Sequence, residues 1–361
     1  MTRSRTQRRT ILTAFFWAIT LLAPVAAMAI GIGYVSYWTI PPFRVYVDGD
    51  PFLSYDSEIG YVARPNSSAK WTAFATDGKT TRQYHVHTDR RGARVANRGE
   101  QTPDHVDIVI VGDSFAWGHG VDGDDTFAFK VTSALGGSGA NLALAGYGTT
   151  HSLQMLRRNR DMAPKLVVFP IIRDHLWRNV SACARSYYPF CLDYSHIAWD
   201  AKGQPYIAAP GSNGVARVAL QIQAERGRLN PMTWILHGLD VVVARLRFKA
   251  ANAVAVNTAK QNAALEFLIQ QMASTASDMK ATLLLVYLPD ESMSPPPEVL
   301  SRSAGLHGYR FLDLSETFLK LGAAARAQLY LPNDGHPSPA GHTFIAQQLI
   351  AFIRREQLLP P

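Results

Sequence analysis

The chain has 361 residues, of which 47% are hydrophobic and 18% are charged, a composition typical of globular proteins and not of disordered ones. The formal net charge is +8, but Arg3, Arg5, Arg8 and Arg9 supply half of it. The remainder therefore lacks the dense basic surface of a nucleic-acid-binding protein, and we expect no nucleic-acid partner.

The first 36 residues predict attachment to a membrane. No residue from Ile11 to Val35 is charged, and as a helix this segment would extend about 37 Å, enough to cross a bilayer. The basic tip, residues 1–10, predicts a cytoplasmic N-terminus, which places the rest of a single-pass protein outside the inner (plasma) membrane, in the periplasm. The alternatives are a cleaved signal peptide ending at Ala27-Met28-Ala29 and a twin-arginine signal at Arg8-Arg9. Because the apolar run continues past the cleavage site, an uncleaved anchor over 11–36 is favoured.

The only two cysteines, Cys183 and Cys191, lie eight positions apart. In an exported chain such a pair predicts a local disulfide, with two unpaired thiols as the alternative. A metal site would require more ligands nearby than the sequence offers.

Residues 37–104 predict a β-rich lead-in without helical periodicity, with strands over 70–75 and 81–88. His85 and His87 share one face of such a strand, but no third ligand lies within sequence reach. We therefore expect a solvated strand face here and no metal.

From residue 105 to 361, strand and helix patterns alternate. Strands are expected over 106–111, 140–145, 166–172, 282–287 and 309–314, and helices over 125–135, 150–161, 258–278, 298–304, 315–323 and 339–354. Asp124 or Asp125 is expected to cap the first helix. The alternation predicts a three-layer α/β/α sandwich around a central parallel sheet. An insertion at about 173–252, with an apolar helix over 234–248, interrupts it after the third strand.

The apolar strand 106–111 ends at Gly112-Asp113-Ser114-Phe115. Gly112 permits a tight turn, so Ser114 begins the next element at the end of the strand. A serine in this place becomes a nucleophile if a histidine and a carboxylate reach it. Asp334-Gly335-His336 offers both residue types. Asp113 is expected to stabilise the turn through hydrogen bonds from backbone amides.

Four polar stretches are expected at the carboxyl ends of strands, where the reactive groups of open parallel sheets gather. Their order and spacing resemble the SGNH (GDSL-like) hydrolase superfamily over about residues 107–353, and the resemblance implies a flavodoxin-like SGNH fold. The stretches are 112–115, 141–148, 171–175 and 333–336. The lead-in is similar to that of exported members, in Ile59-Gly60-Tyr61 and Thr88 to Arg94. The Asp-x-His spacing is similar to the spacing in an exported, membrane-anchored branch of this superfamily, which resembles polysaccharide O-acetyl esterases and acetyltransferases.

The resemblance implies a role for each matching residue. Ser114 is the expected nucleophile, His336 the general base, and Asp334 the residue that orients His336. A polar helix-capping turn is the alternative for Asp334 and His336. The amides of Ser114 and Gly146 are the expected oxyanion donors, with Gly148 as the alternative to Gly146. The superfamily's third donor is an asparagine that this chain lacks. Its place reads Arg173-Asp174-His175, so Arg173 or His175 is expected to replace it.

These residues together predict a serine esterase or O-acyltransferase that works through a seryl-ester intermediate. The resemblance implies O-acetyl groups of cell-envelope or secreted polysaccharide as its substrate. A lipid esterase or thioesterase is the first alternative, and a non-catalytic scaffold of polysaccharide assembly is the second. No cofactor is implied.

Overall fold

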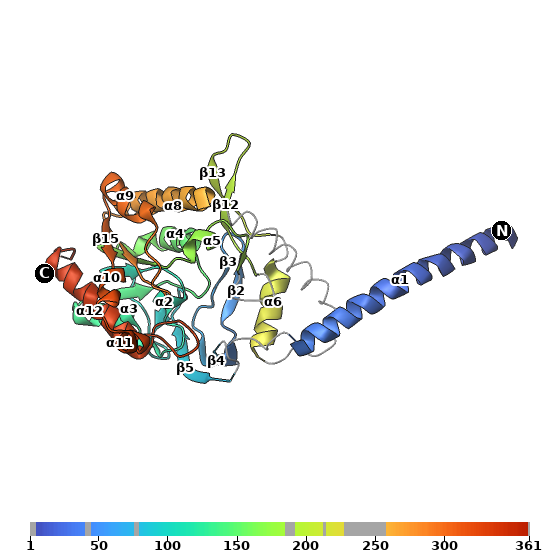
Figure 1. Cartoon of the computed structure of the whole chain (residues 1–361), viewed down its shortest axis with the longest axis horizontal. Helices are drawn as coiled ribbons and strands as arrows, with labels where there is room; N and C mark the ends of the chain where they lie inside the picture. The colour runs from blue at the N-terminus through green and yellow to red at the C-terminus, as the bar shows by residue number, and fades with distance from the viewer. Residues whose placement is uncertain are drawn as a thin grey trace.

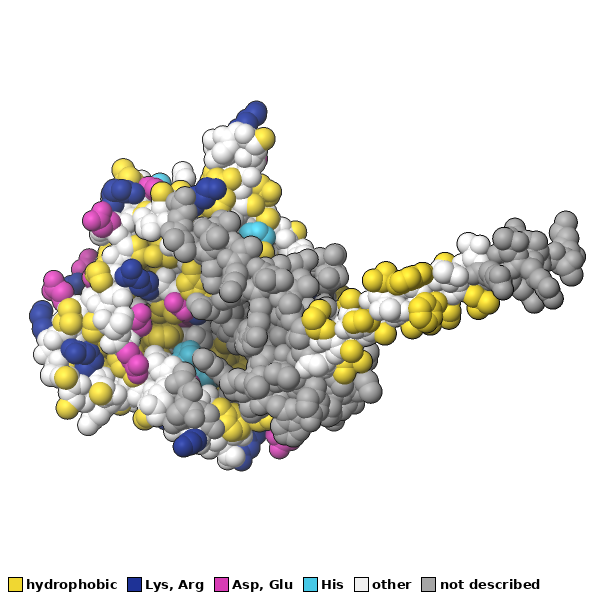
Figure 2. Space-filling model, turned by 45° about the vertical axis from the view of Figure 1, so that its right-hand side comes forward, with side chains coloured by type: hydrophobic (Ala, Val, Ile, Leu, Met, Phe, Trp, Pro, Cys, Tyr) yellow, Lys and Arg dark blue, Asp and Glu magenta, His cyan; other side chains and the backbone are white. Residues whose placement is uncertain are grey.

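The computed structural model describes residues 5–39, 45–75, 79–184, 192–211, 214–226 and 258–359. Helix α1 (Arg5–Thr39) extends away from the rounded body that holds the other elements (Figure 1). Its segment Thr10–Met28 is long and apolar enough to cross a membrane. The hydrophobic side chains of this segment are exposed, and Figure 2 shows them along the helix. The expected spanning helix is thus present by length and composition.

Nine strands form the central sheet, in the order β1-β4-β5-β6-β8-β7-β9-β14-β15. Neighbours are parallel among five of them, namely β7 (Ile108–Ile110), β8 (Gly139–Asn141), β9 (Leu166–Ile171), β14 (Thr282–Tyr287) and β15 (Arg310–Asp313). Taken in chain order, these five strands stand in the order 2-1-3-4-5, as in flavodoxin-like sheets. All residues of β7 and β9 are buried, which explains their unbroken apolar sequence.

The lead-in supplies the other four strands of the same sheet, and all of them pair antiparallel. They are β1 (Val45–Gly49), β4 (Ser68–Phe74), β5 (Thr81–Thr88) and β6 (Arg94–Val95). Arg94 of β6 pairs with Asn141 of β8, which joins the lead-in to the parallel half. The prediction of a parallel sheet is corrected to a mixed, mostly parallel one. A separate hairpin is formed by β2 (Leu53–Asp56) and β3 (Gly60–Ala63).

Helices cover both faces of the sheet (Figure 1). On one face α3 (Phe127–Ala134) packs against α12 (Pro339–Arg355). On the other face α8 (Thr258–Asp278) packs against α4 (Thr149–Arg158) and α9 (Glu298–His307). This is the arrangement that right-handed crossovers between parallel strands produce, and it gives the expected mixed α/β layers.

Several boundaries follow the sequence pattern and others do not. Helix α8 and strand β14 begin and end where the pattern predicts. Helix α3 is capped by Thr126, whose side chain accepts the Phe129 amide at 3.2 Å, and not by the predicted Asp124 or Asp125. The helix expected over 315–323 is two short ones, α10 (Ser315–Leu319) and α11 (Ala323–Ala327), separated near Gly322. Glycine is a poor helix former, which explains the break.

The described residues between β9 and β14 form short elements. They are α5 (His175–Arg178), β10 (Cys183–Ala184), β11 (Leu192–Asp193), β12 (His196–Trp199), β13 (Pro205–Ala208) and α6 (Gly214–Glu225). Cys183 is disulfide-bonded. Its expected partner Cys191, and the helix expected over 234–248, lie outside the described residues.

Two fully buried histidines make the stability of this fold depend on pH. His342 of α12 accepts the Phe127 amide through Nδ1 at 3.1 Å, and His151 of α4 accepts the Gly148 amide through Nδ1 at 2.9 Å. Burial lowers the pKa of each to about 3. Each stays neutral in the folded chain, whereas in the unfolded chain it takes up a proton near pH 6.5. Their contribution is therefore complete above pH 6.5 and is lost as the pH falls toward 3.

We predict that the free energy of unfolding falls by roughly 1 to 2 kcal/mol per histidine between pH 7.5 and pH 5. Urea unfolding at the two pH values measures this loss. His342→Asn should reduce the loss, because the Asn oxygen can still accept the Phe127 amide but does not titrate. An unchanged pH dependence in this variant would contradict the assignment.

Candidate active site

A tight turn joins β7 to the short helix α2 (Ser114–Trp117). Gly112 has φ +155°, and a Cβ there would lie 2.9 Å from the side chain of Ala116, so the turn requires glycine. Asp113 Oδ1 accepts the Phe115 amide at 3.0 Å, which confirms the predicted role of this carboxylate. Ser114 therefore stands at the first position of α2, at the carboxyl end of β7.

The structure brings Ser114, His336 and Asp334 together across 222 positions of sequence. His336 Nε2 lies 2.8 Å from Ser114 Oγ. The other ring nitrogen, Nδ1, forms a short hydrogen bond with Asp334 Oδ1. The side chains of His336 and Asp334 are 22% and 14% exposed, so the group lies at the surface of the body but is largely enclosed.

The loop that carries Asp334 and His336 lies between α11 and α12. The sequence had suggested that this loop follows a strand directly. In the structure α10 and α11 lie between β15 and the loop. The Leu331 amide donates to the His336 carbonyl at 2.7 Å, and Gly335 has φ +83°. Ser338 caps α12 by accepting the Gly341 amide at 3.1 Å. The alternative that Asp334 and His336 are capping residues is therefore wrong.

Asp334 is held ionised by its neighbours. Burial by itself raises the pKa of Asp334, but the hydrogen bond from His336 and the electrostatic interactions with the His336 and His119 rings bring the pKa below its ordinary value. An ionised Asp334 stabilises the imidazolium that forms when His336 accepts a proton.

A second histidine lies beside this pair. His119 Nε2 is 3.9 Å from Asp334 Oδ2, and the rings of His119 and His336 are 4.5 Å apart. His119 Nδ1 is 3.3 Å from the hydroxyl of Tyr84, a residue of β5. With that hydroxyl donating to Nδ1, the proton of neutral His119 lies on Nε2, on the side of Asp334. From the sequence, His119 could either line a substrate pocket or only pack, because neither Tyr84 nor Asp334 is near it in the chain.

His119, Asp334 and His336 each offer one atom that could bind a metal ion, and these three atoms all lie within 4.8 Å of one another. This spacing suits a divalent cation with nitrogen and oxygen ligands. A cation there would take one ring nitrogen of His336, and both of these nitrogens already have partners, Asp334 and Ser114.

The loop that carries His119 is attached to the lead-in through Arg94. This buried guanidinium donates to the carbonyls of Trp117, Gly118 and Val121, at 2.6 Å in the case of Gly118. Burial lowers the pKa of Arg94 to about 10, so it keeps its charge at neutral pH. The lead-in thus fixes one end of the nucleophile helix.

The turn with the expected oxyanion donors lies next to the nucleophile turn. The Leu144 amide donates to the Gly112 carbonyl at 3.1 Å. Among the described residues, the amides of Ser114 and Gly146 donate to no other group, so both are available to a ligand. The Gly148 amide, in contrast, donates to His151 Nδ1 at 2.9 Å. This bond overturns the alternative assignment of Gly148 as a donor.

The residues after β9 do not supply the expected third donor. His175 is fully buried, with Nε2 3.5 Å from Asp113 Oδ2 and Nδ1 3.4 Å from Thr149 Oγ1. Because both ring nitrogens face these partners, the prediction that His175 donates to the oxyanion is wrong. Arg173 is exposed near Tyr287, and its role as a donor stays a prediction.

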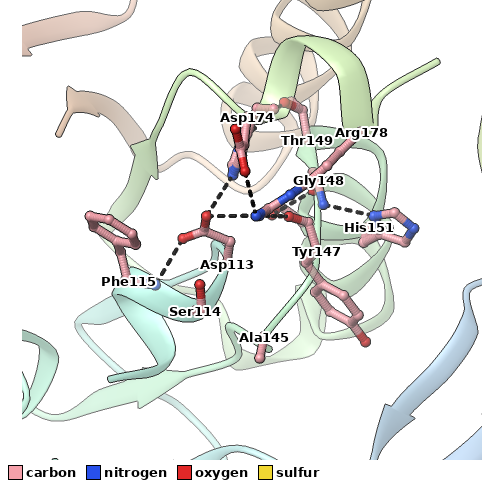
Figure 3. A network of polar contacts seen from close by, with 12 residues as sticks. Asp113, Ser114, Phe115, Ala145, Tyr147, Gly148, Thr149, His151, Asp174 and Arg178 are labelled. Carbon is pink, nitrogen blue, oxygen red and sulfur yellow. Dashed lines mark hydrogen bonds and ion pairs between the residues drawn. The ribbon is translucent and has the colours of Figure 1, made fainter. Parts of the chain in front are cut away.

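A buried arginine connects the nucleophile turn to the oxyanion turn (Figure 3). Arg178 Nη1 donates to Asp113 Oδ2 at 2.9 Å and to the Tyr147 carbonyl at 3.0 Å, while Nη2 donates to Asp174 Oδ2 at 3.2 Å. Burial raises the pKa of Asp113, but contacts with His175 and Arg178 bring it below its ordinary value. The sequence pattern suggested a role for residues 173–175. The side chain that joins the two turns is Arg178, one helical turn further along α5.

No protein-family model and no curated protein matches the sequence. Three similar solved structures are TesA, a lipase/acylhydrolase from Enterococcus faecalis and a catalytic mutant of Axe2, an acetylxylan esterase from Geobacillus stearothermophilus. Their identities are 14%, 12% and 13%, and their TM-scores are 0.37, 0.37 and 0.35. The matches cover 70%, 69% and 68% of this chain and 99%, 96% and 92% of those chains. At these TM-scores the similarity is too low to assign an activity. The function is therefore inferred from the geometry of the site.

We predict that Arg178→Met destabilises the fold by about 3 to 5 kcal/mol, because it leaves Asp113 charged and buried without its partner. Chemical unfolding of the detergent-solubilised chain measures the loss. The double variant Asp113→Asn/Arg178→Met should lose less than the sum of the two single variants, since both remove the same interaction. The control is Arg355→Met, which breaks an exposed pair with Glu356 and should cost no more than about 1 kcal/mol. Equal losses in Arg178→Met and Arg355→Met would contradict the assignment.

Proposed function

We propose that this protein is a membrane-anchored serine esterase or O-acyltransferase of the SGNH type. The observation that carries the proposal is the continuous hydrogen-bonded series Ser114 Oγ, His336 and Asp334. This is the arrangement that turns a weakly nucleophilic hydroxyl into an attacking group.

In the first half of the reaction, Ser114 Oγ attacks the ester carbonyl carbon, and His336 Nε2 takes the hydroxyl proton. The carbonyl oxygen becomes negative and receives hydrogen bonds from the amides of Ser114 and Gly146. The carbon–oxygen bond to the alcohol then breaks, and His336 gives its proton to the departing alcohol. The acyl group is left as an ester of Ser114.

In the second half, His336 takes a proton from the incoming hydroxyl, whose oxygen attacks the seryl ester. Water as this nucleophile releases a carboxylic acid, and a sugar hydroxyl forms a new ester. In both cases the proton returns to Ser114. The two outcomes use the same residues, so the acceptor alone distinguishes esterase from transferase.

Two observations support a site outside the cytoplasm. Helix α1 has the length and composition of a membrane span, and the basic residues before it favour a cytoplasmic N-terminus. Cys183 is disulfide-bonded, which is typical of oxidising compartments. The domain therefore belongs on the periplasmic face, in reach of cell-envelope or secreted polysaccharide.

The apolar packing that continues from Phe115 bears on the length of the acyl group. The apolar side chains that continue from Phe115 are close-packed and leave no room for a water molecule between them. They are Phe115, Leu288, Pro289, Phe318, Leu329, Tyr330, Pro337 and Ile345. Among the described residues, these side chains provide no groove for a long acyl chain next to Phe115, which supports a short acyl group such as acetyl.

We predict that Ser114→Ala and His336→Ala each lower kcat by at least about 1000-fold, and that Asp334→Asn lowers it by about 10,000-fold. The measurement is turnover of 4-nitrophenyl acetate by the full chain in detergent, with labelling by a serine-reactive fluorophosphonate. The matched control is Ser301→Ala, an exposed serine of α9. A folded wild type that neither turns over the ester nor takes the label would indicate a scaffold protein instead.

We also predict that kcat/KM does not rise as the acyl group of the ester lengthens from acetyl to octanoyl. A continuous apolar groove would raise it about fourfold per added methylene group, through about 0.8 kcal/mol of burial each. The same series on the full chain therefore separates an acetyl esterase from a lipid esterase or thioesterase. Release of acetate from an O-acetylated polysaccharide, lost in Ser114→Ala, would establish the substrate class.

A further inference from the structure

The residues of the turn that carries Gly146 are compatible with more than one turn type. The Tyr147 amide donates to the Leu144 carbonyl at 3.2 Å, and Gly146 has φ +83°. These two features define a type II turn over 144–147, with Gly146 at the third position. Glycine also adopts the negative φ of a type I turn without strain. Another interaction must therefore select between the two forms.

The two turn types differ in the direction of a single peptide unit, the one that joins Ala145 to Gly146. This unit is rotated by about 180° between type II and type I. In a trans peptide the carbonyl and the N–H point in opposite directions. The direction of the Ala145 carbonyl therefore fixes the direction of the Gly146 amide.

Tyr61 of β3 holds that carbonyl. Its hydroxyl donates to the Ala145 oxygen at 3.1 Å, across 84 positions of sequence. Tyr61 is fully buried, and its ring packs against that of Tyr147 with 5.6 Å between centroids. The Tyr147 hydroxyl donates back to the Tyr61 carbonyl at 2.9 Å. The hydroxyl of Tyr61 is thus fixed by packing and by a second bond from the turn.

The peptide unit that joins Tyr147 to Gly148, two units further along the chain, is fixed from both sides. Arg178 binds the Tyr147 carbonyl, and His151 accepts the Gly148 amide (Figure 3). The Tyr61 hydroxyl acts on the peptide unit that joins Ala145 to Gly146, through its bond to the Ala145 carbonyl.

We infer that Tyr61 is a positioning residue for oxyanion stabilisation, and that it acts by holding the Gly146 amide toward the reacting carbonyl. The inference rests on the proposed function. It makes the lead-in hairpin of β2 and β3 part of the catalytic machinery, although that hairpin supplies no group that touches the substrate.

The test is Tyr61→Phe in the full chain, which removes one oxygen atom and keeps the ring. We expect kcat for 4-nitrophenyl acetate to fall by about 10- to 100-fold, with KM changed less than about threefold, because the bond acts on the transition state. An aryl trifluoromethyl ketone, which adds to the serine as an oxyanion, should bind more weakly by the same factor. A purely structural role would not produce this parallel loss.

The matched control is Tyr309→Phe. Tyr309, which lies just before β15, is also buried and also donates its hydroxyl to a backbone carbonyl, that of Leu300 in α9. The control should lose comparable stability and keep its kcat and ketone affinity. If Tyr61→Phe retains the kcat and ketone affinity of Tyr309→Phe, the inference is wrong while the proposed function stands. A wild type without turnover or ketone binding overturns both.

A second variant covers the case in which Tyr61→Phe does not fold. Gly146→Ala places a side chain at a positive φ and so favours the type I turn, in which the amide points away. It should lower kcat and ketone affinity together, as Tyr61→Phe does. The double variant should lose no more than the larger single loss, because both changes act on the same peptide. Retained kcat in Gly146→Ala, or fully additive losses, would overturn the inference.

Discussion

The Asp113–Arg178 pair is the interaction on which the arrangement of the site depends. Both side chains are almost completely removed from water, and a charge in such a place is tolerated only when it is paired and hydrogen-bonded. Asp113 is adjacent to Ser114, and Arg178 also binds the carbonyl of Tyr147. The need to pair two buried charges therefore brings the end of β7, the end of β8 and helix α5 to one place. The turn that carries Ser114 and the turn that carries Gly146 are thus joined through one side chain, Arg178.

The lead-in, residues 37–104, is not a separate unit. It packs into the same body and contacts the residues around Ser114. Its strand β6 extends the central sheet, Arg94 holds the end of α2, and Tyr84 lies against His119. Each contact reaches a backbone or side chain close to Ser114. An enzyme that needs its groups within fractions of an ångström gains from such a rigid surround, because positioned groups cost no reorganisation during the reaction.

The sequence predicted the parts of this protein that depend on local pattern. Unbroken apolar runs identified the parallel strands, and helical periodicity located α8 and α12. The Gly-Asp-Ser turn and the Asp-x-His spacing identified Ser114, Asp334 and His336 as a group. The resemblance to a known superfamily, and not spacing alone, linked residues so far apart in the chain.

The parts that the sequence missed depend on contacts between distant segments. A buried arginine such as Arg178 looks like any other helical arginine until its partner is known. His175 seemed a donor because of its place after β9, but the carboxylate of Asp113 faces it. The lead-in strands gave a β pattern without showing that β6 would pair with β8. Pairing across 45 or more positions leaves no mark in the alternation of a single strand.

The separation of 222 positions between Ser114 and His336 has a consequence for the synthesis of this protein. Ser114 leaves the ribosome well before His336, by roughly 10 to 45 s at ordinary rates of elongation. Helix α12, which lies beyond His336, must also pack on α3 to hold the loop of the base in place. A chain interrupted between Ser114 and its last helix therefore contains the serine but not a positioned His336. Under the proposed function, such unfinished chains would carry Ser114 without the hydrogen-bonded series that makes it react with an ester.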